Sequence, residues 1–409
     1  MAASNQSHPA AESGAIDEHF LHALAEFDDP LGFVSILVDV DRSDAGDPRP
    51  SWELTTRNAL GDLADKLKDE GDQGAEAAAR LADASDAVDE LLDPRTSGRS
   101  RALILALGSG TRHRVISDAP LPNEVSFGTV PRLAPLAAAV SASGRAGLAS
   151  VSRSGLDVFS PQAGNSGRLV SEPFDEDTDE WRKMVGPAGD SPALARHSAS
   201  QRDLFSRRVE EHLIQFLVRR SDAVAALAEA EAWQALVVAG DPRLTEPVVD
   251  TLRAKLDRRG TSTSVSAIAS SRHWDRDSEL KDELDGALAE LRRERDQALV
   301  ERAHDGALAD GSAVLGAADV INGLAEGRVE HLLIGRDATI RGAKSAAGQL
   351  VLAGERPPGI DRQVLGAEVD LVDDVIKRAF ASGSKVTVPA GEPAALLRER
   401  GDVAALVRW

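Results

Sequence analysis

The stretch VLGAADVINGLAEGRVEHLLIG, residues 314–335, carries in sequence the signals of a helix, a stop and a strand. Apolar spacing predicts a helix over Ala317–Ala325, which Gly327 ends because glycine accepts a left-handed backbone. The apolar run that follows predicts a buried strand over Val329–Ile334. Strands are then expected at 385–389 and 403–409, and helices at 370–380 and 393–400, with a loop at 342–358. This βα alternation predicts an α/β domain with a mixed sheet over residues 261–409.

A second pattern precedes it, over residues 133–260. Three short apolar runs, at 135–142, 147–153 and 155–161, are separated by glycine-containing turns and predict an antiparallel meander. A long helix (Ala199–Ala230), a strand (Gln234–Gly240) and a helix that begins at Asp241-Pro242 follow. Together they predict a central α/β domain. A strand near residues 263–270 and a charged helix over Asp275–His304 open the next domain.

The first 132 residues predict a further α/β domain. Expected helices lie at 16–26, 52–69 and 74–92, and expected strands at 32–40, 102–107 and 113–117. The last two strands read as a pair, with Gly108–Thr111 as the hairpin turn between them. The fold class is therefore α/β (α+β) with three domains: 1–132, 133–260 and 261–409.

Composition excludes several kinds of site. The chain of 409 residues has no cysteine and no HExxH pair among its nine histidines, which excludes thiolate chemistry and makes a metal site or other cofactor unexpected. No apolar run reaches the length of a membrane span, so a cytoplasmic protein is expected. No GxSxG, Walker A or GxGxxG motif is present, and Asp39 with Asp41 after a strand favours a loop over a catalytic pair.

Basic residues gather in two places on a chain of net charge −20. One group lies between residues 95 and 114. The other lies in Trp181–Arg220, where a segment rich in Gly, Pro and Ser enters the long helix, and its arginines are compatible with RNA phosphates. Residue composition alone leaves open whether this is a solvated helix face or a binding surface.

The stretch 314–335 also resembles the C-terminal domain of the archaeal and eukaryotic peptide release factors and of Pelota. Gly316, Val320, Leu324 and Gly327 occupy matching positions, and the order meander, loop, long helix, strand, helix resembles their central domain. Where that family has its Gly-Gly-Gln loop, this chain has His197-Ser198-Ala199-Ser200-Gln201. In this departure the chain resembles the bacterial branch of the family, which includes the ribosome hibernation factor Balon.

The resemblance implies a stress or hibernation factor, a monomer that occupies the ribosomal A site without hydrolysing peptidyl-tRNA. It implies contact with rRNA of the A site and the peptidyl transferase centre, and association with elongation factor Tu. The open alternatives are a divergent peptidyl-tRNA hydrolase or release factor, in which Gln201 positions water, and a Pelota-like rescue factor. The expected rRNA-binding residues are Trp181, Arg182, Lys183, Arg196, His197, Ser198, Gln201, Arg202, Arg207 and Arg208.

Overall fold

The computed structural model describes residues 11–40, 50–96, 98–117, 119–143, 145–160, 168–174, 192–261, 263–269, 277–309, 311–345, 347–354 and 365–409, with the backbone alone at 11–15, 192–206 and 277–284. It divides into two compact units. One is Met1–Ser143 with Asp296–Trp409, and the other is Gly144–Arg295. Among the described residues, none of the helices is long and apolar enough to cross a bilayer.

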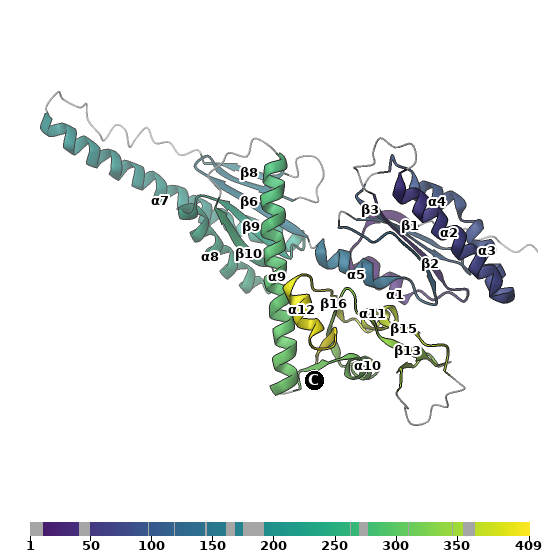
Figure 1. Ribbon diagram of the computed structural model, residues 1–409. Coiled ribbons are helices and arrows are strands. Elements are labelled where there is room, and N and C mark those ends of the chain that lie inside the picture. The colour runs from purple at the N-terminus through teal and green to yellow at the C-terminus, as the bar shows by residue number, and fades with distance from the viewer. Residues whose placement is uncertain are drawn as a thin grey trace, which may run out of the picture. The chain divides into compact units, whose positions relative to one another are not determined.

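The first unit begins with a five-stranded sheet in the order β1-β4-β3-β2-β5 (Figure 1). Its strands are β1 (Ala11–Ala15), β2 (Phe33–Asp39), β3 (Ser100–Ala106), β4 (Arg112–Ser117) and β5 (Glu124–Gly128). Alternate residues of β2 and β3 pack on opposite faces, as the pleat requires. Helices α1 (Glu18–Glu26) and α5 (Leu133–Ala142) cover one face; α2 (Ser51–Asp69), α3 (Gly71–Ala82) and α4 (Ser85–Leu92) cover the other.

The same unit contains two smaller sheets. One has the order β11-β17-β12-β16, and the other has the order β14-β13-β15. The strands are β11 (Ala313–Leu315), β12 (Val329–Ile334), β13 (Arg341–Lys344), β14 (Leu350–Leu352), β15 (Val369–Asp370), β16 (Lys385–Thr387) and β17 (Val403–Val407); the helices are α10 (Ala317–Ala325), α11 (Val372–Ala381) and α12 (Glu392–Arg398). Residues of α1, α5, α10 and α11 belong to one continuous apolar core.

The second unit is a single sheet in the order β10-β9-β6-β7-β8 with helices on both faces. Its strands are β6 (Ala146–Ser152), β7 (Gly155–Phe159), β8 (Arg168–Pro173), β9 (Ala235–Gly240) and β10 (Ser264–Ala269). Helices α7 (Pro192–Ala230) and α8 (Pro242–Arg259) pack on one face, and Leu288 and Leu291 of α9 (Asp277–Ala309) pack on the other. β10, expected to open the next domain, pairs in parallel with β9.

Much of the expected secondary structure is confirmed. The helix over Ala317–Ala325 and the strand over Val329–Ile334 have the expected bounds, and β3 pairs with β4 as expected. The turn between those strands is a hairpin in which the Asp29 carboxylate accepts hydrogen bonds from the Gly108 and Ser109 N–H groups, at 2.6 and 2.8 Å. Ser100 Oγ donates to Asp39 at 3.1 Å, which gives that carboxylate a structural partner; Asp41 lies outside the described residues.

Several further expectations are wrong. Residues 135–142, expected as a strand, belong to α5, where Leu133, Leu136 and Ala137 follow the i, i+3, i+4 spacing of a helix that is buried nearly all round. Residues 342–358, expected as a loop, contain β13 and β14. The single helix expected over 74–92 is α3 and α4, with a turn at Asp83–Ala84 between them. β1, β5, β8 and β11 were not expected from the sequence.

Candidate functional site: the projecting helix α7

Helix α7 is the longest element that the structure describes. Its 39 residues span about 58 Å at 1.5 Å per residue, far more than the sheet on which it packs. From Arg207 on, where the structure describes the side chains of α7, the first buried one is Leu213, and Leu217, Val224, Ala225 and Ala228 follow. Leu213 lies 21 positions after Pro192, so roughly 30 Å of helix precedes this residue. Figure 1 shows this N-terminal half projecting beyond its own sheet as the teal helix.

The packed half of α7 is fixed by ion pairs as well as by apolar contacts. Arg259 of α8 pairs with Glu229 at 2.7 Å, and Lys255 of α8 pairs with Asp222. Arg220 lies 5.4 Å from the centre of the Phe216 ring and pairs with Glu172 of β8 at 3.2 Å. These partly exposed pairs contribute little stability individually, and they join the packed half of α7 to α8 and β8.

A buried tryptophan, Trp233, follows the C-terminal end of α7. Ala232 adopts a positive φ of 52°, and the Trp233 N–H donates to the Ala228 carbonyl at 2.9 Å. The Trp233 side chain is 3% exposed and lies against Gly147 of β6, where an added Cβ would meet the ring at 2.2 Å. Because residue 147 has no side chain, the Trp233 ring can pack directly against β6, and this contact holds the C-terminal end of α7 on the sheet.

Gly147→Ala is expected to destabilise the second unit by about 1–3 kcal/mol, because the new methyl group must displace the packed Trp233 ring. Gly286→Ala in α9 is the matched control, since a Cβ at residue 286 has open space around it and alanine favours a helix. Chemical denaturation followed by tryptophan fluorescence measures both variants. Equal midpoints for Gly147→Ala and the parent chain would contradict this role of Trp233.

The first part of α7 is locally basic. Between residues 192 and 208 the sequence has four arginines and one aspartate, on a chain of net charge −20. Arg207 and Arg208 are exposed. Arg196, His197, Ser198, Gln201 and Arg202 lie within the helical backbone of α7, while their side chains fall outside the described residues. Trp181, Arg182 and Lys183 lie outside the described residues altogether.

The start of α7 differs from the expected one. The helix begins at Pro192, seven residues before the expected Ala199, so positions 197–201 are helical and not part of a loop. In a helix, only the first four N–H groups lack an intrahelical partner. Gln201 is the tenth residue of α7, and its N–H therefore belongs to the helical hydrogen-bond ladder.

The other basic group, between residues 95 and 114, is largely engaged within the first unit. Arg112 pairs with Asp86 of α4 at 2.8 Å, and Arg114 pairs with Glu90. Arg101 is 1% exposed, and its guanidinium donates to the Leu91 and Asp93 carbonyls at 2.8 and 2.7 Å. Burial lowers the pKa of Arg101, with a further contribution from Arg114. This leaves α7 as the stronger candidate for phosphate contacts.

Comparison with known proteins relates the central part of the chain to translation factors. Residues 131–273, about a third of the chain, match the family model of the bacterial archaeo-eukaryotic release factor family 10. The match begins just before α5 and includes β6–β10, α7 and α8. It confirms the release-factor resemblance for this segment. No curated protein matches the chain.

Several solved structures are similar over most of the chain. The archaeal translation termination factor aRF1 is 16% identical over 97% of this chain and 99% of that one, with a TM-score of 0.24. Pelota of Archaeoglobus fulgidus is 17% identical over 76% and 79%, with a TM-score of 0.31. An archaeal chain in a model of ribosome-bound Pelota and ABCE1 is 12% identical over 97% and 95%, with a TM-score of 0.39. At these values the likenesses do not establish a shared function.

Proposed function

Because residues 131–273 match bacterial archaeo-eukaryotic release factor family 10, we propose that the chain is a ribosome-binding translation factor whose α7 reaches into the ribosome. In this proposal α7 occupies the place of the element that bears Gly-Gly-Gln in release factors, and its tip lies near the peptidyl transferase centre of the A site. The observation that carries the proposal is the projecting, arginine-bearing half of α7 within the matched segment.

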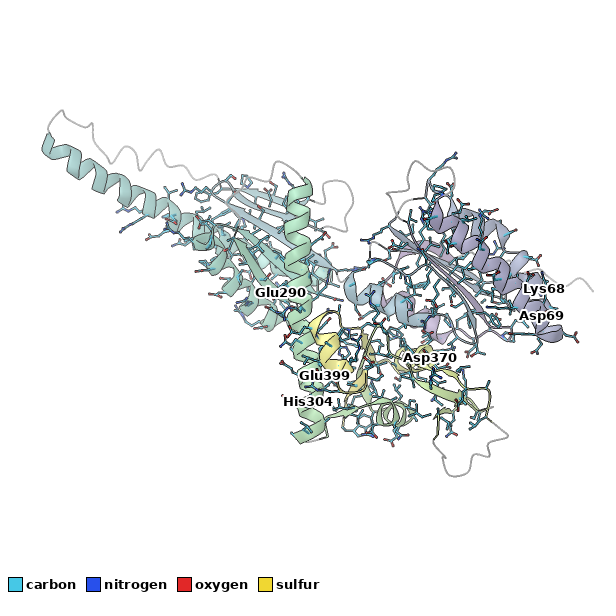
Figure 2. The ribbon with its side chains drawn as sticks, viewed as in Figure 1. Lys68, Asp69, Glu290, His304, Asp370 and Glu399 are labelled. Atoms are coloured by element: carbon cyan, nitrogen blue, oxygen red, sulfur yellow. The ribbon has the colours of Figure 1, made fainter. Side chains whose placement is uncertain are left out.

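Charge supports the choice of α7 as the element that contacts rRNA. The helices α2, α3 and α4 present an acidic surface, since residues 51–92 contain eleven acidic and four basic residues. Lys68 and Asp69, which Figure 2 labels, lie in the last turn of α2. Such a surface repels phosphates. Residues 192–208 of α7 have the opposite sign, with four arginines and one aspartate, so phosphate contacts orient the protein by this part of the helix.

The backbone of α7 favours occupation of the A site without hydrolysis. Ala199 and Ser200 stand where release factors have their two glycines, and they lack the left-handed freedom of glycine. The N–H of Gln201 belongs to the helical ladder and is therefore not offered to a reacting ester. The proposed role is accordingly that of a stress or hibernation factor, and Balon-like cooperation with elongation factor Tu is part of the same proposal.

A peptide-release assay separates the proposed role from the hydrolytic alternative, in which Gln201 positions water. Under the proposed non-hydrolytic role, ribosomes loaded with peptidyl-tRNA are expected to release no more peptide with the purified chain than with buffer. Gln201→Ala is then expected to leave the amount of released peptide unchanged. A release factor of known activity serves as the positive control. Peptide release by the parent chain that Gln201→Ala abolishes would establish the hydrolase and contradict the non-hydrolytic role.

A Pelota-like rescue role is the second alternative. It predicts preference for ribosomes stalled on a truncated message, whereas the proposed hibernation role predicts preference for vacant ribosomes. Binding of the purified chain to the two kinds of ribosome, compared at equal concentration and salt, separates the two roles. Tighter binding to the stalled complex would favour rescue.

A further inference from the structure

Helix α11 carries, on one side, three residues that contact other helices of the first unit. Asp373, Lys377 and Phe380 are spaced i, i+4 and i+7, which places them on one face of a helix. That face packs against α1 and α5, two helices that belong to the N-terminal sheet of the first unit. Residues more than 200 positions apart in the sequence thus meet along a single helix.

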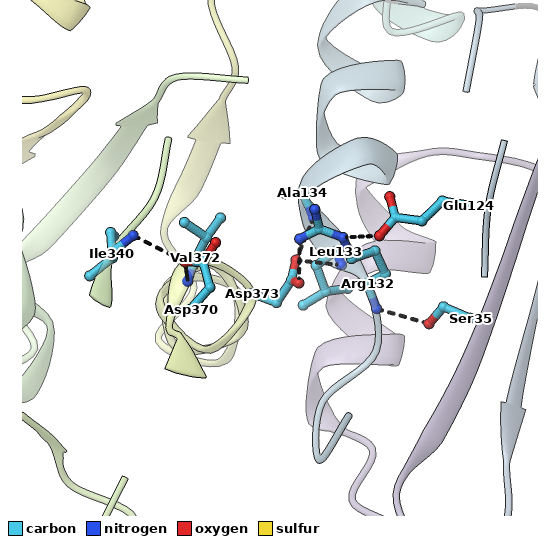
Figure 3. Close-up of polar contacts among 9 residues, drawn as sticks. All are labelled: Ser35, Glu124, Arg132, Leu133, Ala134, Ile340, Asp370, Val372 and Asp373. Atoms are coloured by element: carbon cyan, nitrogen blue, oxygen red, sulfur yellow. Dashed lines mark hydrogen bonds and ion pairs between the residues drawn. The ribbon is translucent and has the colours of Figure 1, made fainter. Parts of the chain in front are cut away.

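Asp373 binds the beginning of α5, as Figure 3 shows. Its carboxylate accepts hydrogen bonds from the N–H groups of Leu133 and Ala134, at 2.9 and 2.8 Å. The α5 helix has no capping side chain of its own, so α11 supplies the cap. Arg132 joins the contact: its guanidinium donates to Asp373 at 2.7 Å and to Glu124 of β5 at 2.9 Å.

Lys377 binds the C-terminal end of α1. Its ammonium group donates to the carbonyl of Phe27, the C-terminal cap of α1, at 3.0 Å, and pairs with the Asp28 carboxylate. A negative group at a helix N-terminus and a positive group at a helix C-terminus are both favoured by the helix dipole. His22 of α1 adds a hydrogen-bond contact between its Nδ1 and the Phe380 carbonyl, at 3.0 Å, and its ring lies edge-on to the Phe380 ring.

We propose that α11 is a clamp that joins the N-terminal sheet and the C-terminal sheets of the first unit into one rigid body. Ile376, Ala379 and Phe380 supply the apolar contact with the core that α1 and α5 share. Apolar contact is not directional, whereas hydrogen bonds to helix ends require a defined angle and distance. The side chains of Asp373 and Lys377 therefore fix the orientation of the two parts, and the apolar core supplies the attraction between them.

Burial makes the Asp373 end of the clamp sensitive to substitution. Desolvation raises the pKa of Asp373, while Arg132 and the two N–H groups of α5 act in the opposite direction. The Arg132 guanidinium would retain only Glu124 as an ion-pair partner among the described residues if Asp373 were removed. The N-terminus of α5 would lose its cap at the same time.

The absence of cysteine allows a direct test of rigidity. Leu54 of α2 and Leu308 of α9 are 54% and 73% exposed and lie in the two parts that the clamp joins. The double variant Leu54→Cys, Leu308→Cys carries two spin labels, and pulsed electron resonance measures the distribution of distances between them. The parent background is expected to give one narrow peak. Adding Asp373→Ala and Lys377→Ala is expected to abolish that peak and give a broad distribution.

Asp374→Asn is the matched control. Asp374 is the next residue of α11 and pairs with Lys344 of β13 at 2.8 Å, within the C-terminal part. The control is expected to keep the narrow peak even if it lowers stability, and circular dichroism verifies that every variant is folded at the temperature used. A broad distribution in the parent background, or a narrow one in the clamp variant, would overturn the proposal. The test uses no ribosomes, so its outcome is independent of the proposed function.

Discussion

Replacing Arg207 and Arg208 together by glutamine is expected to weaken binding to ribosomes and to flatten its dependence on salt. Both side chains are exposed on the projecting half of α7, and each contact with an RNA phosphate releases condensed counterions. Loss of two such contacts lowers the magnitude of the slope of log affinity against log salt by roughly 1.4–1.8. Filter binding or fluorescence anisotropy at several salt concentrations measures this slope.

The matched control for this charge change lies on α8. Arg243 and Arg258 are exposed, and Arg243→Gln with Arg258→Gln lowers the net charge by the same two units. We expect this control to retain the salt dependence of the parent chain, because α8 is packed on the sheet and does not project from it. Equal slopes for the α7 variant and the parent chain would contradict rRNA contact by Arg207 and Arg208.

Asp373→Ala is expected to lower the free energy of unfolding of the first unit by about 3 kcal/mol, or roughly 6–12 °C in Tm. The substitution removes the ion-pair partner of Arg132 and leaves two N–H groups of α5 without their acceptor. Differential scanning calorimetry measures the effect. Asp373→Asn keeps an acceptor oxygen for those N–H groups and is expected to cost less, about 1–2 kcal/mol. A loss below about 1 kcal/mol for Asp373→Ala would show that the contact is dispensable.

Elements with a strong local signal could be predicted from the sequence. The 3.6-residue spacing and the glycine stop of residues 314–335 give α10 and β12 with the expected bounds. Residues 135–142 were assigned the wrong type because an alanine-rich helix that is buried nearly all round has no polar face to reveal its period. Short strands such as β11 and β15 depend on pairing with partners that lie elsewhere in the chain, at β17 and β13.

The candidate site was only partly predictable, for a similar reason. The arginines of α7 are visible in the sequence, but neither the start of the helix at Pro192 nor its projection beyond the sheet has a local signal. The residues between 95 and 114 looked equally basic until their partners Asp86 and Glu90 were known. The contact between Arg132 and Asp373 joins residues 241 positions apart, and no local pattern predicts it.

Sedimentation of stationary-phase lysates through a sucrose gradient tests most directly whether the protein is a ribosome-binding factor. The chain is detected across the gradient by immunoblotting, with a ribosomal protein as a marker and a high-salt gradient in parallel. The proposed function predicts that the chain sediments with ribosomes at low salt and leaves them at high salt. Recovery of the chain only in the ribosome-free fractions at both salt concentrations would contradict it.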